Sequence, residues 1–246
     1  MGLGLGSSLS KTGLTTPSIV TDSLVMKHNY SAGAVVPISD GAASFDGSNS
    51  HIDCGDPIIS GTSDYSFCAW ISKGTAGTVK TIAGNYTGGA GLQGIQFTLS
   101  NSEKFQTYTD GTNDYVTGAT DVPLNTWTHV AATRSSNNAI VYVNGVSDAT
   151  GTLDNDITGL DFTIGANPVS FTEDFTGYIC NVGVWSRALG IAEIKSIMNK
   201  NYSGLTSSET TGLVSWWNLD VETATNGTAG SGGVKDSHGS NHGDLE

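Results

Sequence analysis

Residues 175–198 read FTGYICNVGVWSRALGIAEIKSIM and combine two periodicities. The first half alternates in the manner of a β-strand. Its alternation predicts one face with Tyr178, Cys180, Val182 and Val184 and an opposite face with Ile179, Asn181, Gly183 and Trp185. The second half changes to helical spacing, with apolar residues at positions 189, 192, 194, 197 and 198. No other stretch has a persuasive helical pattern, so we predict one short helix in the C-terminal half of a β chain.

Size and composition also favour a β fold. The chain has 246 residues, which is long enough for one large β domain. Charged residues make up only 13%, about half of the usual share. There are 33 glycines, and Ser, Thr and Asn are plentiful. This mixture is typical of many strands joined by tight turns.

The charge balance limits the partners. The formal net charge is -13, whereas nucleic-acid binding draws its affinity from Lys and Arg. Anionic membrane surfaces are disfavoured for the same reason, and no apolar stretch is long enough to cross a membrane. We therefore expect no nucleic-acid partner and no membrane partner. Solubility is the ordinary explanation of such a charge, and binding of a divalent cation by some carboxylates is the alternative.

The strand pattern is that of a sandwich. Residues 66–72 are nearly apolar on both faces, which predicts a central strand covered on both sides. A hairpin is expected from 127–134 and 139–145 around a four-residue polar turn, and further strands at 43–45, 78–84, 94–100, 104–110 and 161–165. Leu213 repeats the spacing seen at Leu24. We favour two neighbouring strands of one sheet as the reason, and a truncated second module opened by Leu213 is the alternative.

Residues 1–20 are rich in Gly, Ser and Thr and have little periodicity. We predict an N-terminal arm or linker there, ordered only against a partner, and one domain at 21–246. The first ten residues do not resemble a secretory signal, so we expect a protein that acts inside a cell or leaves it by another route, such as lysis. Of the three cysteines, Cys68 and Cys180 fall inside strand patterns and are expected to be buried.

Several segments in fixed order together resemble the laminin-G-like branch of the concanavalin-A-like lectin/glucanase superfamily. They are residues 45–52, 66–71, 127–130, 141–145, 177–189, 193–194 and 212–220. The resemblance covers roughly 21–246 and implies an all-β jelly-roll sandwich of two antiparallel sheets, with the short helix packed at one edge. Four large aromatic residues would supply the bulk of its core: Trp70, Trp127, Tyr142 and Trp185.

The same resemblance implies binding of glycans or proteins, often with a structural calcium ion at the rim of the sandwich. Cys180 and Asn181 depart from the family, because its members often carry Asp-Glu at these positions. Oxygen ligands remain at Asp46, Asp53, Glu173 and Asp174. We predict Asp46 and Asp174 as the first metal ligands, and turn-forming aspartates are the alternative.

Catalysis is not expected. Retaining glucanases need two carboxyl groups about 5 Å apart. Only Asp220 and Glu222 alternate as on a strand, and they run into a Gly-rich loop. For ligand binding we predict two aromatic residues in polar, Gly-rich loops, Tyr86 and Tyr115, which could stack on a sugar ring. The alternative is that both rings fill the rim of the sandwich.

Three functions follow from these observations. The first is a virion surface protein of a bacterial virus (a decoration, fibre or tail protein). Such a protein would assemble through its arm, as a homo-oligomer or with other virion proteins, and present a lectin-like sandwich to host glycans. The second is an extracellular carbohydrate-binding module, free-standing or excised from a longer protein. The third is a glycan hydrolase.

Overall fold

The computed structural model describes residues 41–48, 50–55, 57–61, 63–85, 94–109, 114–154, 157, 160–167, 173–220 and 233–246. They belong to a compact unit that spans Pro37–Glu246. The arm predicted at 1–20 and the pattern around Leu24 lie outside the described residues.

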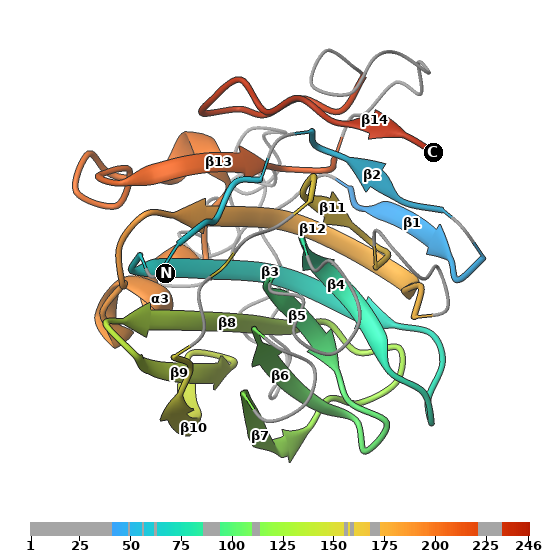
Figure 1. The fold of residues 1–246 in the computed structure, drawn as a ribbon. Helices are drawn as coiled ribbons and strands as arrows, with labels where there is room; N and C mark the ends of the chain where they lie inside the picture. Colours follow the sequence, from blue (N-terminus) through green and yellow to red (C-terminus); the bar gives the residue numbers. More distant parts are fainter. Residues whose placement is uncertain are drawn as a thin grey trace, which may run out of the picture. The chain divides into compact units, whose positions relative to one another are not determined.

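In the described part, fourteen strands form two antiparallel sheets of seven strands each (Figure 1). Sheet A has the order β1-β12-β3-β8-β9-β10, and β13 pairs with β12. Its strands are β1 (Ala43–Asp46), β3 (Tyr65–Lys73), β8 (Thr128–Ser135), β9 (Asn138–Val143), β10 (Val146–Thr152), β12 (Thr176–Trp185) and β13 (Leu213–Trp217).

Sheet B has the order β14-β2-β11-β4-β5-β6-β7. Its strands are β2 (Ile52–Asp53), β4 (Lys80–Gly84), β5 (Gln96–Leu99), β6 (Lys104–Tyr108), β7 (Tyr115–Asp121), β11 (Thr163–Ile164) and β14 (Asp244–Leu245). Helix α3 (Ile191–Ile197) and the 3₁₀ turn η3 (Tyr202–Gly204) follow β12. The predicted jelly-roll sandwich with one short helix is confirmed. None of the helices in the described part is long and apolar enough to cross a membrane.

Aromatic rings fill the space between the two sheets. Phe67 of β3 stacks on Phe97 of β5, with ring centroids 4.0 Å apart and planes 5° apart. Trp217 of β13 stacks on Phe162, just before β11, with centroids 6.0 Å apart. Every residue of β3 is buried, as predicted for a central strand covered on both faces.

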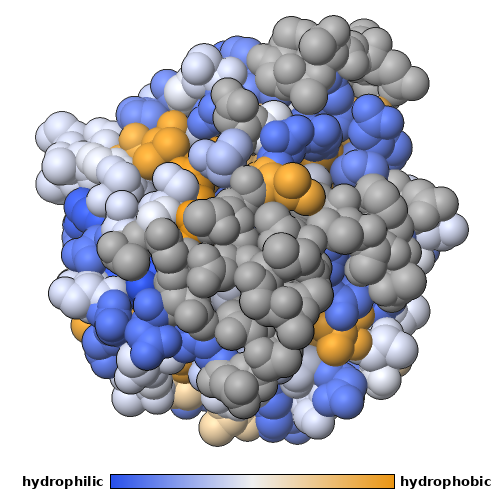
Figure 2. Space-filling model, in the orientation of Figure 1, coloured by the Kyte–Doolittle hydropathy of each residue, from blue (hydrophilic) through white to orange (hydrophobic). Residues whose placement is uncertain are grey.

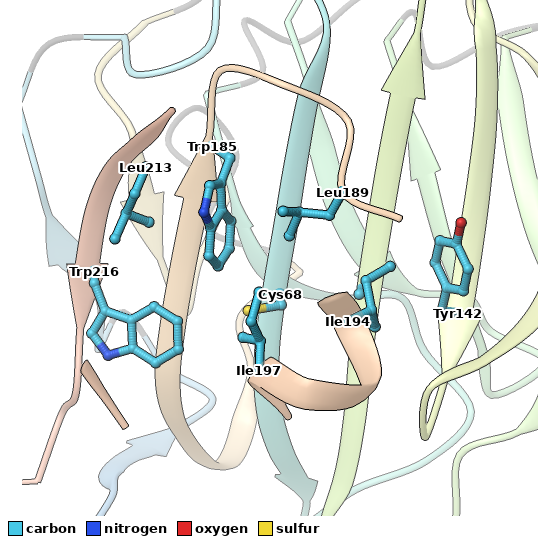
Figure 3. Close-up of a cluster of buried hydrophobic side chains, with 9 residues drawn as sticks. Cys68, Tyr142, Trp185, Leu189, Ile194, Ile197, Leu213 and Trp216 are labelled. Atoms are coloured by element: carbon cyan, nitrogen blue, oxygen red, sulfur yellow. The ribbon is translucent and has the colours of Figure 1, made fainter. Parts of the chain in front are cut away.

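Helix α3 and the segments beside it form a third layer on the outer face of sheet A (Figure 3). Trp185 and Tyr142 are buried in this layer, and the indole N–H of Trp70 donates to the carbonyl of Met198 at its edge, at 2.9 Å. These three residues were predicted for the sandwich core and are instead buried under the helix. The fourth, Trp127, is only partly buried, and its ring lies 6.4 Å from that of the exposed Tyr178.

The predicted alternation of β12 is wrong beyond Cys180. Cys180 pairs with Trp70 and Gly183 pairs with Cys68, so one extra residue forms a bulge between them. Asn181 has a φ of 50°, a left-handed conformation that Asn tolerates. As a result Val182 pairs with Trp217 and points between the sheets, on the side opposite to the predicted one.

Gly183 then lies on the outer face, where its missing side chain leaves room for two indoles. A Cβ at this position would lie 2.7 Å from Trp216 and 2.8 Å from Trp185. The two rings pack edge to face, with centroids 6.0 Å apart. The bulge therefore sets which side chains of β12 meet the helical layer.

The turn between β8 and β9 is shorter than predicted. Ser135 pairs with Asn138, so two residues form the turn instead of four. Ser136 has a φ of 53°, and its N–H donates to the carboxylate of Asp64 at 2.7 Å. The carboxylate supports a backbone conformation that serine seldom adopts.

The C-terminal strands complete this same sandwich. One edge of β12 carries β1 along residues 176–179 and β13 along residues 182–185, while β3 occupies the other edge. The last strand, β14, pairs with β2 in sheet B. The segment opened by Leu213 is therefore part of this domain.

Candidate ligand-binding face

The outer face of sheet B carries two rows of side chains, most of which are buried. Phe97 points between the sheets, so its neighbour Gln96 points outward, and residues directly opposite each other on antiparallel strands share a face. The long row crosses all seven strands: Asp244, Asp53, Thr163, Gly84, Gln96, Tyr108 and Tyr115. The short row crosses β4 to β7: Thr81, Thr98, Gln106 and Thr117.

Tyr115 is the exposed aromatic residue at the end of the long row. It is 42% exposed, and its ring packs edge to face on Tyr108, with centroids 5.5 Å apart. The hydroxyl of Tyr108 donates in turn to Oε1 of Gln96. Tyr115 begins strand β7 and does not lie in a loop as the sequence suggested. Its orientation is thus fixed by a sheet and by a neighbouring ring.

Three side chains of these rows are buried with unmet hydrogen-bonding capacity. Nε2 of Gln96 and the hydroxyls of Thr81 and Thr98 have no hydrogen-bond partner. Beside them, Thr117 donates to Oε1 of Gln106 at 3.2 Å. Buried polar atoms are usually satisfied, so unmet atoms on one face mark a place for ordered water or a ligand. Sequence spacing alone did not indicate this row.

In the view of Figure 2, the part of the surface that belongs to the described residues is mainly hydrophilic, and its hydrophobic residues lie in small, separate patches.

The predicted metal ligands Asp46 and Asp174 approach the same end of β12. Asp46 is exposed and pairs with Thr176, while Asp174 is buried two residues before that strand position. Hydrogen bonds from the Ser50 hydroxyl and the Ser48 N–H, each 2.8 Å long, lower the pKa of Asp46.

Across the described ranges, no three His, Cys, Asp or Glu side chains form a group that could hold a metal. Calcium at Asp46 and Asp174 would therefore need carbonyls and water as its other ligands. It stays a prediction. The other predicted ligand-binding residue, Tyr86, lies outside the described residues.

Buried carboxylates in the C-terminal half serve the fold. Both carboxylate oxygens of Glu209 accept from Lys200 at 2.7 Å, and one accepts from the Thr206 N–H at 2.7 Å. Burial opposes ionisation of Glu209, but these hydrogen bonds outweigh it and lower its pKa to about 2. The Lys200–Glu209 ion pair holds the segment between α3 and β13 in place. In the same segment, the carbonyl of Glu209 accepts a hydrogen bond from the indole N–H of Trp185.

Asp220, one of the two carboxylates with strand-like spacing, lines a cleft of about 270 Å³ at the edge of the sandwich. Its predicted partner Glu222 lies outside the described residues. The other lining residues are mostly apolar: Ala42, Ala43, Ser44, Ile52, Leu219, Val234 and Leu245. One carboxylate in such surroundings does not form the pair that a retaining hydrolase requires.

The fold and its paired sheets agree with a comparison against protein families. Residues 46–195 match the laminin-G-like family Laminin_G_3 of the concanavalin A-like lectin/glucanases superfamily. The chain belongs to this family. A search of curated protein sequences finds no significant match.

Similar solved structures share the fold at low identity. A proposed carbohydrate-binding protein of Bacteroides ovatus ATCC 8483 superposes with a TM-score of 0.65 at 22% identity, over 86% of this chain and 59% of that protein. Domain 4 of AbnA, an extracellular arabinanase of Geobacillus stearothermophilus solved with arabinotriose, gives 0.54 at 20% identity, over 64% and 76%. The CBM40 module of a Ruminococcus gnavus sialidase, bound to α2,3-sialyllactose, gives 0.55 at 14% identity, over 66% and 100%.

Proposed function

We propose that this chain is a non-catalytic carbohydrate-binding module whose ligand lies beside Tyr115, on the outer face of β6 and β7 at the edge of sheet B. One observation carries the proposal: an exposed tyrosine ring lies in the same row as a buried amide with unmet hydrogen-bonding capacity. A sugar offers an apolar ring face and several hydroxyls, which match an aromatic surface and amide or hydroxyl groups. The carbohydrate-binding descriptions of the similar structures support the same function.

The geometry favours a particular arrangement. Tyr108 holds one edge of the Tyr115 ring, and the exposed part of Tyr115 supplies the stacking surface. Gln106 and Thr117, in the neighbouring row, supply the nearest accessible amide and hydroxyl. Neither row contains Lys or Arg, so we expect a neutral glycan in preference to an acidic one.

The test is a glycan array followed by calorimetry on the best ligand. We expect Tyr115→Ala to weaken binding about tenfold or more, equivalent to roughly 1.4 kcal/mol. Tyr178→Ala is the matched control, because Tyr178 is 50% exposed but lies on sheet A. Unchanged affinity in Tyr115→Ala, or an equal loss in both variants, would refute this placement of the ligand.

We further propose that the module acts on the surface of a bacteriophage virion, as a decoration, fibre or tail component. Only 13% of the residues are charged, and Gly, Ser, Thr and Asn are abundant. Both features support this setting. Light scattering with and without residues 1–20 tests it: a discrete oligomer that becomes a monomer without the arm is expected. A monomer in both cases would favour an extracellular module, and turnover of a β-glucan would favour a hydrolase.

A further inference from the structure

Asp244 of β14 is a buried carboxylate whose two oxygens both lack a hydrogen-bond partner. The residue is only 1% exposed. Burying a carboxylate without donors or a counter-charge costs several kcal/mol, so proteins seldom leave one in that state.

Asp236, in the same C-terminal segment, shows how this fold satisfies a buried carboxylate. Its oxygens accept four backbone N–H groups at 2.9 to 3.1 Å, from Trp216, His238, Gly239 and Asn241. Asp244 receives none of these donors. The contrast indicates that Asp244 is built to meet something other than a backbone N–H group.

A second carboxylate lies directly opposite. Asp53 of β2 pairs with Asp244, and both side chains lie on the outer face of sheet B. Directly opposed residues have Cβ atoms about 5 Å apart, and like charges at that distance destabilise the sheet. Asp53 is half-buried, and one of its oxygens accepts the N–H of Gly55 at 2.9 Å.

Next in the row is Thr163, which pairs with Asp53; its hydroxyl donates to the carbonyl of Ala166 at 2.7 Å, which leaves the lone pairs of the oxygen for a cation. The surroundings therefore combine carboxylate and hydroxyl oxygens with unbalanced negative charge.

We propose that Asp53 and Asp244 together bind a divalent cation, of the calcium class, that joins β14 to β2. Two carboxylates neutralise its charge, and neutral oxygens complete the coordination that calcium accepts. Without a third His, Cys, Asp or Glu in the described part of the site, zinc is disfavoured. The strand β14 has only two residues, so the ion would fasten a strand that backbone pairing alone holds weakly.

This site is separate from the predicted one at Asp46 and Asp174, and substitutions distinguish the two. The full chain is treated with chelator, dialysed, and titrated with calcium by calorimetry and thermal melting. We expect calcium to raise the melting temperature of the wild type. Asp53→Asn and Asp244→Asn should weaken calcium binding about tenfold or more. Asp46→Asn should keep the calcium-binding step that Asp53→Asn and Asp244→Asn weaken.

A second readout separates a ligand role from a structural one. In chelator, Asp244→Asn should melt at or above the wild-type temperature, because it removes a buried charge without a partner. The Glu246 N–H donates to the His51 carbonyl at 3.0 Å. In hydrogen exchange, the protection of this N–H should rise with calcium in the wild type. This rise in protection should be absent in Asp53→Asn. Because Asp53 is only half-buried, this variant provides the test if Asp244→Asn fails to fold.

Two outcomes would overturn the proposal. The first is a wild type that binds no calcium and shows no shift in melting temperature or exchange. The second is calcium binding that survives Asp53→Asn and is lost in Asp46→Asn, which would place the ion at Asp46, in β1 of sheet A.

Discussion

His129 should make this domain sensitive to mild acid. Its imidazole is fully buried in β8, packs edge to face on Trp70 with centroids 5.4 Å apart, and has no hydrogen-bond partner at Nδ1. Burial lowers its pKa from 6.5 to about 3, because the charged ring cannot be solvated there. The folded protein therefore keeps His129 neutral across the mildly acidic range.

The sign and size of the effect follow from linkage. Below pH 6.5 the imidazole of His129 binds a proton in the unfolded chain but not in the folded chain. Stability therefore falls as the pH falls toward 3. Each pH unit in this window lowers the free energy of unfolding by up to about 1.4 kcal/mol. At pH 5 the loss relative to pH 8 is about 2 kcal/mol, set by the pKa of the unfolded chain because the folded pKa lies well below 5.

The assay is urea unfolding at pH 8 and pH 5, followed by tryptophan fluorescence. Between these two conditions, the wild type should lose about 2 kcal/mol more than His129→Phe, which keeps a ring against Trp70. Val130→Ala is the matched control: it removes buried methyl groups from the same strand and should lower stability equally at both pH values. An identical pH dependence in the wild type and His129→Phe would refute the reasoning.

Two further substitutions test the packing. Gly183→Ala places a Cβ 2.7 Å from Trp216 and 2.8 Å from Trp185, and should cost about 1–3 kcal/mol in thermal or urea unfolding; a neutral result would mean that the two indoles can move apart. Asp148 of β10 accepts the N–H and hydroxyl of Thr120 in β7, at 3.0 and 2.5 Å, so Asp148→Ala should cost about 1–3 kcal/mol and also weaken glycan binding. Hydrogen exchange in β7 that is the same in Asp148→Ala and in the wild type would contradict the expectation for Asp148.

Much of the fold could be predicted because buried strands carry their own pattern. Residues 66–72 are apolar on both faces since sheet B covers one side and helix α3 the other. The change of period within 175–198 located the strand and the helix correctly. What it could not show was the bulge at Asn181, because one extra residue leaves the composition of a strand unchanged while reversing its faces.

The edge strands β7 and β10 were missed for the opposite reason. Both are rich in small and polar residues, and each contains a glycine, Gly118 or Gly151, that weakens a strand pattern. Their glycines are needed because the two strands approach closely: a Cβ on Gly118 would meet the Asp148 carboxylate, and one on Gly151 would lie 2.9 Å from Val116. The turn signal Asn144-Gly145 could have indicated that a partner strand follows β9.

The sequence favours Tyr115 as a ligand-binding residue from its type and polar surroundings, and this stays a prediction. Its position in a row with Gln96 could not be predicted, because it depends on a pairing between distant segments. The opposition of Asp53 and Asp244 depends on a pairing of residues nearly two hundred positions apart, which spacing cannot reveal.

The order of strands in sheet B places the last residues of the chain and Tyr115 at opposite edges. The chain end lies at the β14 edge and Tyr115 at the β7 edge, six strand spacings away, or roughly 29 Å at about 4.8 Å for each spacing. Residue Ala42 lines the same edge cleft as Leu245, so the chain enters and leaves this sandwich on one side. A surface, tag or neighbouring module joined there would leave the β7 edge pointing away from the junction. A sensor chip joined at the C-terminus would therefore lie at the edge of sheet B opposite to Tyr115.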